Sequence, residues 1–142
     1  MRTVVEPFGR EHLEAASEVF AARHAGDRGR WPYLPAEYEM GSQVCLALAD
    51  LLEQEGSRGV AALRGGVVVG YVLGKAMFPA TASPAASVWR PRSAAVAYHG
   101  HAAHAGGAYD IYREMYAALT EQWLSQGLFA HYASVNSCDA AT

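Results

Sequence analysis

Residues 60–73 read VAALRGGVVVGYVL, which is two apolar runs on either side of an arginine and two glycines. The second run is rich in valine, a β-branched residue that packs well on a pleated sheet. Gly65 and Gly66 tolerate the positive φ angles that a tight hairpin turn requires. The stretch therefore predicts an antiparallel hairpin over Arg58–Lys75, near the centre of the chain.

Helices are predicted on both sides of the hairpin by apolar residues that recur every three or four positions. Leu13, Ala16 and Phe20 form one such stripe before it, and Tyr112, Tyr116, Leu119 and Trp123 form another after it. In chain order, the expected elements are a strand Thr3–Val5, a helix Arg10–Ala25 stopped by Gly26, a helical turn Pro35–Met40, a helix capped by Ser42 and stopped by Gly56, the hairpin, a loop Met77–Ser87, a strand Ser93–Tyr98, a loop His99–Gly107, a helix Ile111–Gln126 capped by Asp110, and a strand Leu128–Val135. This β-α-α-β-β-β-α-β order predicts an α/β (α+β) fold with a mixed, mostly antiparallel sheet flanked by helices.

Length and composition predict one globular domain over residues 1–142, because 51% of the residues are hydrophobic and 18% are charged. The net charge of −3 argues against a nucleic-acid binder. No apolar run approaches the roughly 20 residues of a membrane span, and no signal peptide is visible, so we expect a cytoplasmic protein with no membrane partner. The two cysteines, Cys45 and Cys138, do not define a disulfide framework, and Cys138 is interpreted as a buried or edge thiol.

Acidic residues are missing from the middle of the chain, with none between Ser57 and Tyr109. The same stretch contains the basic residues Arg58, Arg64, Lys75, Arg90 and Arg92. One interpretation is that buried strands exclude charge while long basic side chains reach water from the strand ends. The other is that the exposed edges of the sheet favour an anionic ligand.

The order of elements, with Val67–Tyr71 on the second hairpin strand, resembles the GCN5-related N-acetyltransferase (GNAT) family. Residues 97–102 (AYHGHA) and 111–119 (IYREMYAAL) are similar to the amino-terminal lobe of bacterial proteins with two tandem GNAT lobes. In such proteins the carboxy-terminal lobe keeps the acetyl-CoA motif. The resemblance covers the whole chain and implies a fold without its last helix and strands. Asp139 looks like the cap of a further helix, and the sequence reaches Thr142 about one turn into it.

The resemblance also implies a cofactor loop of the form Gln/Arg-x-x-Gly-x-Gly/Ala between the fourth strand and the following helix. Glycines there let backbone N–H groups approach a pyrophosphate at the helix N-terminus. Here the slot runs from His101 to Gly107, and of the motif positions only Gly106 matches, with His104 in place of the middle glycine. The candidate residues for binding acetyl-CoA are Val96, His101, Ala102, Gly106 and Gly107. A self-capped loop that does not bind the cofactor is the alternative, because Asp110 would use the free N–H groups itself.

Acetyl transfer to an amine needs a group that takes the ammonium proton and a group that protonates the leaving thiolate. GNAT enzymes often use a glutamate near the fourth strand and a tyrosine on the helix after the fifth strand. The hairpin and fourth strand here contain no acidic residue, and that helix is absent. The candidate catalytic residues are therefore His99, His101 and Tyr98, with ordinary polar residues as the alternative.

Other clusters are assigned by position. Trp31, Tyr33 and Tyr38 lie where GNAT proteins commonly shape the acceptor pocket, and core or lid packing is the alternative. The histidines at 99, 101, 104 and 131 lack cysteine or acidic neighbours in the sequence, so we predict no metal site.

Two main functions of different classes follow from these observations, and a small-molecule or metal binder that uses the histidine loop is a third alternative. The first is a GNAT-like N-acetyltransferase that uses acetyl-CoA and a small-molecule amine, with chemistry that requires a fuller chain or a second lobe. The second is a non-catalytic packing or dimerisation module. Its partner would be a second copy or a second GNAT lobe, bound through the edge strand Leu128–Val135.

Overall fold

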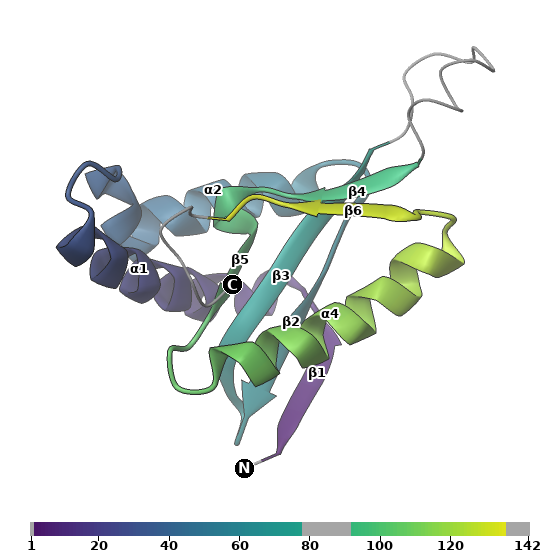
Figure 1. Cartoon of the computed structure of the whole chain (residues 1–142), viewed down its shortest axis with the longest axis horizontal. Helices are drawn as coiled ribbons and strands as arrows, with labels where there is room; N and C mark the ends of the chain where they lie inside the picture. The colour runs from purple at the N-terminus through teal and green to yellow at the C-terminus, as the bar shows by residue number, and fades with distance from the viewer. Residues whose placement is uncertain (1, 78–91, 136–142) are drawn as a thin grey trace.

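The computed structural model describes residues 2–77 and 92–135 (Figure 1). The strands are β1 (Thr3–Pro7), β2 (Ser57–Arg64), β3 (Val67–Met77), β4 (Ser93–Val96), β5 (His101–Ala103) and β6 (Ala130–Ala133). The helices are α1 (Leu13–Arg30), α2 (Gly41–Glu53) and α4 (Ala108–Ser125), with 3-10 turns η1 (Arg10–His12), η2 (Ala36–Glu39) and η3 (Tyr98–Gly100). The predicted order of major elements is confirmed, with a short extra strand, β5, before α4.

One six-stranded sheet runs in the order β1-β2-β3-β4-β6, and β5 pairs with β3 beside β4. All described pairings are antiparallel except that of β4 with β6, which is parallel. This confirms the mixed, mostly antiparallel sheet. The predicted hairpin is β2 and β3, joined at Gly65 and Gly66, whose φ angles are +58° and +79°.

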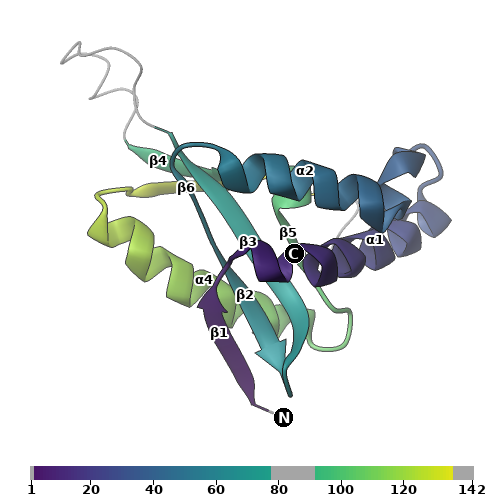
Figure 2. The ribbon, with the colours of Figure 1, turned by 180° about the vertical axis from the view of Figure 1, so that it is seen from behind.

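Helices cover both faces of the sheet. Figure 1 shows α4 in front of it, and Figure 2 shows α1 and α2 on the opposite side. Neighbouring residues on a strand supply opposite layers, because side chains alternate across a strand. Tyr71 packs in the layer under α1 and α2, whereas Val72 packs in the layer under α4. The alternation in the hairpin therefore builds two cores from one strand pair.

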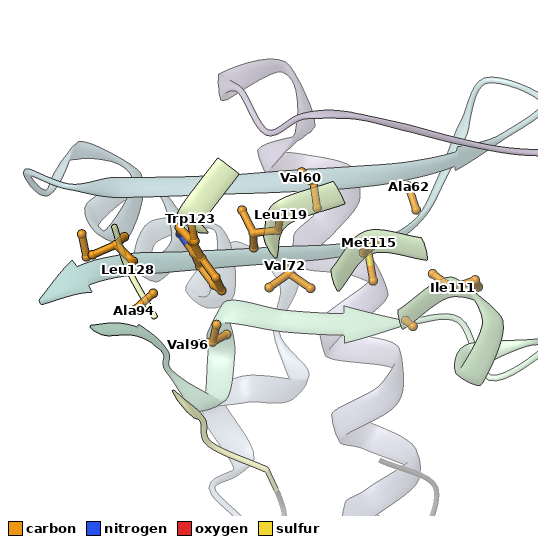
Figure 3. Close-up of a cluster of buried hydrophobic side chains, with 12 residues drawn as sticks. Val60, Ala62, Val72, Ala94, Val96, Ile111, Met115, Leu119, Trp123 and Leu128 are labelled. Atoms are coloured by element: carbon orange, nitrogen blue, oxygen red, sulfur yellow. The ribbon is translucent and has the colours of Figure 1, made fainter. Parts of the chain in front are cut away.

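The layer under α4 depends on glycines in β3. Helix α4 packs against the sheet through Met115, Leu119 and Trp123 (Figure 3). A β-carbon at Gly70 would lie 2.7 Å from Ile111 Cγ2, and one at Gly74 would lie 2.8 Å from Trp123 Cζ2. The missing side chains let the helix and its aromatic stripe approach the strand closely.

Several predicted boundaries differ from the structure. The first helix continues through Gly26 to Arg30, because Arg28 holds the following loop by a hydrogen bond to the Leu34 carbonyl and an ion pair with Glu39. Ser42 is not a cap, since α2 begins at Gly41 after Met40. The last strand is shorter than predicted and spans Ala130–Ala133.

The predicted strand Ser93–Tyr98 is wrong in its last two residues, and the loop predicted over His99–Gly107 is wrong in its first five residues, which complete η3 and form β5. The backbone leaves β4 after Val96, makes the turn η3 and returns to β3 as β5. Gly100 permits this turn, because a β-carbon there would lie 2.5 Å from the Leu73 carbonyl oxygen. The loop predicted at Met77–Ser87, apart from Met77 itself, lies outside the described residues, as do Arg90, Cys138 and Asp139.

Candidate functional site

The sheet divides where β4 and β6 separate. The two strands pair in parallel from Ser93 with Ala130 to Val96 with Ala133, and the Ser134 N–H then donates to the Val96 carbonyl at 2.9 Å. Beyond this point the chain of β4 turns towards β3 as β5, while the chain of β6 continues to Val135. Figure 1 shows β4 and β6 side by side and β5 running down along β3.

Two cavities lie at this division. The first has a volume of about 520 Å³ and is lined by α4 together with Val96, Ala133 and Val135. The second has a volume of about 410 Å³ and is lined by α2 together with Val96, His99 and Ser134. Because side chains alternate along the chain at residues 133–135, the cavities lie on opposite faces of the sheet, and Val96 lines both. We call them the α4 cavity and the α2 cavity.

His101 bridges the gap between the separated chains. Its Nε2–H donates to the Ser134 carbonyl at 2.8 Å, and its Nδ1 accepts from the Tyr112 hydroxyl at 3.0 Å. This assignment requires the neutral tautomer with the proton on Nε2, because a carbonyl can only accept. Arg23 also donates to the Tyr112 hydroxyl, at 3.0 Å. The predicted catalytic residue His101 therefore lies at the division, buried, with both ring nitrogens engaged.

Tyr98 points away from both cavities into an aromatic cluster under α1. Its hydroxyl donates to His24 Nδ1 at 3.0 Å, and His24 Nε2–H donates to the Pro35 carbonyl at 2.7 Å. Tyr38 packs edge-on against His24, with ring centroids 5.6 Å apart. The structure thus brings Tyr98 and Tyr38 together as part of the packing between α1, η2 and η3.

Trp31 and Tyr33, the other residues predicted to shape a pocket, lie apart from this cluster. Their rings contact each other with centroids 5.9 Å apart, and both are exposed. Neither lines the α4 cavity or the α2 cavity, and Tyr38 does not line them either. The predicted acceptor pocket is therefore not assembled from these three residues around the described cavities.

His99 lines the α2 cavity and differs from the other five histidines in its hydrogen bonding. The rings of His12, His24, His101, His104 and His131 all make hydrogen bonds. Among the described residues, no partner bonds the ring of His99, and only its backbone carbonyl is engaged, by the Tyr71 hydroxyl at 2.6 Å. Burial lowers the pKa of His99 below its usual value, and the nearby Asp50 carboxylate opposes this. Burial therefore favours the neutral form of His99, and no described residue bonds its ring nitrogens.

Asp50 and Lys75 also line the α2 cavity, and sequence reasoning did not assign them to a site. Asp50 comes from α2, outside the region near the fourth strand where the family resemblance implies a carboxylate. Its only sequence signal is a place on α2 one residue before the buried Leu51. Lys75 belongs to the basic stretch noted above, and its position on β3 directs it to the same face as Tyr71 and Leu73.

The loop before α4 presents backbone donors. Gly107 has a φ of +93°, and α4 begins at Ala108 with no side chain capping its N-terminus. The predicted cap at Asp110 is wrong: this residue lies inside the first turn and is exposed, with an Arg113 ion pair at 3.8 Å. Asp110 folds into the helix because the left-handed Gly107 turns the chain three residues earlier. The first-turn N–H groups are therefore not consumed by a carboxylate.

Two basic side chains lie at this loop. A β-carbon at Gly107 would lie 3.3 Å from Arg64 Nη1, so the guanidinium is beside the loop, held by its Nε–H bond to Thr3 Oγ1 at 2.9 Å. His104 is exposed, and its Nδ1 accepts from the Gly106 N–H at 3.4 Å. Open amides and a guanidinium suit a phosphate, which is the group that acetyl-CoA would present here. The His104 ring takes up part of that space.

The remaining predicted cofactor residues are buried strand residues. Val96 lines both cavities, whereas Ala102 packs under α1 and α2. Among the described residues, no group of three or more histidine, cysteine or acidic side chains is arranged to hold a metal ion. No helix in the described ranges is both long and apolar enough to cross a membrane.

Comparison with known proteins gives matches at the level of structure. No protein-family model matches the sequence. No curated protein matches it significantly. A ribosomal-protein-alanine N-acetyltransferase from Brucella melitensis biovar Abortus 2308 superposes with a TM-score of 0.65 at 12% identity, over 96% of this chain and 82% of that one. A transcriptional regulator from Bacillus halodurans C-125 gives 0.65 at 16% identity, over 96% and 83%. The aminoglycoside N-acetyltransferase AAC(6')-Iy in complex with CoA gives 0.60 at 12% identity, over 96% and 78%.

Proposed function

We propose that this chain, whose fold is that of the GCN5-related N-acetyltransferases, transfers an acetyl group from acetyl-CoA to an amine. The observation that carries the proposal is the pair of cavities that meet at Val96 from opposite faces of the sheet. Transfer between two bound substrates requires that their reacting atoms be held close together and aligned, and two cavities that share Val96 offer such an arrangement. The solved relative in complex with CoA supports the choice of cofactor.

The loop before α4 is the proposed binding site for the phosphates of the cofactor. Gly107 and the uncapped first turn of α4 supply backbone donors, and Arg64 supplies a fixed positive charge. Gly106 and Gly107 keep their predicted roles. His101 is proposed to brace the chains on either side of the division, because both of its ring nitrogens are already bonded.

His99 is the proposed general base. Acetyl-CoA supplies an activated thioester carbonyl, and the amine nitrogen forms a C–N bond to it as the C–S bond breaks. The amine reacts in its neutral form, so an ammonium first releases one proton to solvent. His99 then takes the second proton, which the nitrogen loses as the C–N bond forms, and the leaving sulfur takes a proton from solvent. Neutral His99 is able to accept this proton, since burial holds its pKa below the usual value despite the Asp50 carboxylate.

Calorimetric titration of acetyl-CoA into the whole chain tests the proposal. We expect micromolar binding, about 8 kcal/mol, and weaker binding by Arg64→Gln, because its guanidinium would contact a phosphate. Arg58→Gln, an exposed position elsewhere on β2, is the matched control and is expected to bind as the unmodified protein does. Absence of binding would overturn the proposal and favour the non-catalytic packing module.

Thiol release from acetyl-CoA, followed with a panel of amines, tests the transfer itself. The expected result is amine-dependent release that His99→Gln lowers by about 10²- to 10⁴-fold in kcat, the range that general bases typically contribute. Release that needs a second protein lobe added in trans would place the missing chemistry in that lobe. Release that is unchanged in His99→Gln would remove His99 from the mechanism.

A further inference from the structure

Two charged residues of opposite sign line the α2 cavity. Asp50 comes from α2 and Lys75 from β3, and both line the cavity. Elsewhere on the surface, Arg10 pairs with Glu53 and Arg28 pairs with Glu39. Among the described residues, neither Asp50 nor Lys75 has an ion pair or a side-chain hydrogen bond. Both are therefore available to a ligand.

Opposite charges on two walls of one cavity select a ligand that carries both signs. A carboxylate attracts an ammonium, and a lysine ammonium attracts a carboxylate. A simple polyamine would satisfy Asp50 but be repelled by Lys75, and a dicarboxylate without an amine would have the reverse problem. A zwitterion satisfies both walls together.

The volume and the remaining walls limit the size of the ligand. About 410 Å³ is within the range of roughly 300–1,000 Å³ found for small-molecule sites. Leu51, Met77 and Ala97 also line the cavity and supply apolar surface. An amino acid with an apolar side chain matches this combination of two charges and an apolar wall.

We propose that the α2 cavity binds a zwitterionic amine, such as an apolar α-amino acid, with its ammonium towards Asp50 and His99 and its carboxylate towards Lys75. The inference rests on the proposed function, because it identifies the acceptor for that transfer. His99, whose ring has no partner among the described residues, lies on the same cavity and faces the amine that must lose its proton.

Three amines that share one side chain test the proposal: leucine, leucinamide and isoamylamine. The last two lack the carboxylate, so kcat/KM for acetyl transfer is expected to be at least tenfold higher with leucine. Lys75→Met keeps the length of the side chain and is expected to remove this preference by raising KM for leucine alone. Asp50→Asn is expected to raise KM for all three, and Arg58→Met, on the neighbouring strand, serves as the matched control.

Direct titration of leucine and leucinamide into the protein separates this proposal from the proposed function. Tighter binding of leucine that Lys75→Met abolishes would support the zwitterion site even if no transfer were detected. Transfer to all three amines with equal kcat/KM would overturn the zwitterion site and leave the acetyltransferase intact. Equal binding of leucine and leucinamide would likewise overturn it.

Discussion

In the proposed mechanism, His99 is the residue whose protonation state would decide activity. Burial lowers its pKa, and the Asp50 carboxylate raises it in part. The other groups that face it are Lys75 across the cavity and Tyr71 beneath its backbone, and burial raises the pKa of Tyr71, which keeps that hydroxyl neutral. A base with a lowered pKa loses its function only when the pH falls below that pKa.

The expected pH profile follows from these contacts. The acid limb of kcat/KM lies below pH 6.5, about the usual pKa of histidine. Asp50→Asn removes the charge that favours protonated His99, so the limb moves to lower pH. Rates measured from pH 5 to 8 with both proteins check this. A limb that moves upward in Asp50→Asn would contradict the assignment of His99 as the base.

A substitution of His104 is also expected to change the affinity for acetyl-CoA in a definite direction. Its ring accepts the Gly106 N–H, which the proposed function offers to a phosphate. His104→Gly frees that donor, so acetyl-CoA is expected to bind about 3- to 10-fold more tightly, the equivalent of roughly one hydrogen bond. Calorimetry measures the affinity for acetyl-CoA, and Ala105→Gly serves as a control for added loop flexibility. Weaker binding by His104→Gly would mean that the imidazole itself contacts the cofactor.

The helices and strands that a local sequence pattern determines were predicted correctly. The hairpin was predicted almost to the residue, because Gly65 and Gly66 fix its turn and the apolar runs fix its strands. The ends of the first helix and the fourth strand were missed. Tertiary contacts decide them: those of Arg28 with Leu34 and Glu39 across the following loop, and the approach of Gly100 to Leu73 on another strand.

The candidate site was predictable only in part for the same reason. Sequence patterns identified His99 and the loop before α4. The cofactor motif, the helix cap and the acceptor pocket were predicted only from residues that are adjacent in the sequence. Asp50 and Lys75 join His99 only when α2 and β3 pack against the division in the sheet. The spacing of Asp50, Lys75 and His99 in the sequence does not predict that they line one cavity.

The packing of α4 on β3 gives a prediction at the scale of elements. Gly74→Ala would place a methyl group 2.8 Å from Trp123, so the helix or the ring must shift. Overpacking of this kind costs typically 1–3 kcal/mol, and the free energy of unfolding is expected to fall by about that amount. Thermal or urea denaturation measures the change.

A matched substitution provides the control for this prediction. Gly26→Ala lies inside α1, where a β-carbon would meet nothing within 4 Å. It is expected to stabilise the protein by about 0.5–1 kcal/mol, because alanine is the better helix former. Equal effects of the two substitutions would contradict the close approach at Gly74.

At the scale of the whole molecule, the cavities on the two faces of the sheet are lined by different kinds of residue. The face under α2 ends in charged groups around a small cavity, whereas the face under α4 ends in aromatic side chains and the uncapped loop. The division between β4 and β6 joins them, and His101 holds its two sides together. An amine on one face and a thioester on the other would meet at Val96 without sharing a cavity.

The outer edge of β6 gives a prediction about association. Within the described residues, β6 pairs only with β4, and Phe129 and Tyr132 are 72% and 59% exposed beside it. An exposed edge strand favours pairing, and a second copy related by a two-fold axis offers the same edge in return. We therefore expect the isolated chain to form a dimer through residues 128–135.

Light scattering across a range of protein concentrations measures this association. Phe129→Glu places a charge at the expected contact without touching either cavity, so it is expected to shift the dimer towards monomer and leave acetyl-CoA binding unchanged. Leu46→Glu, an equally exposed apolar position on α2, is the control and should leave the mass unchanged. A protein that is strictly monomeric at high concentration would contradict the pairing and leave the edge of β6 to some other segment or partner.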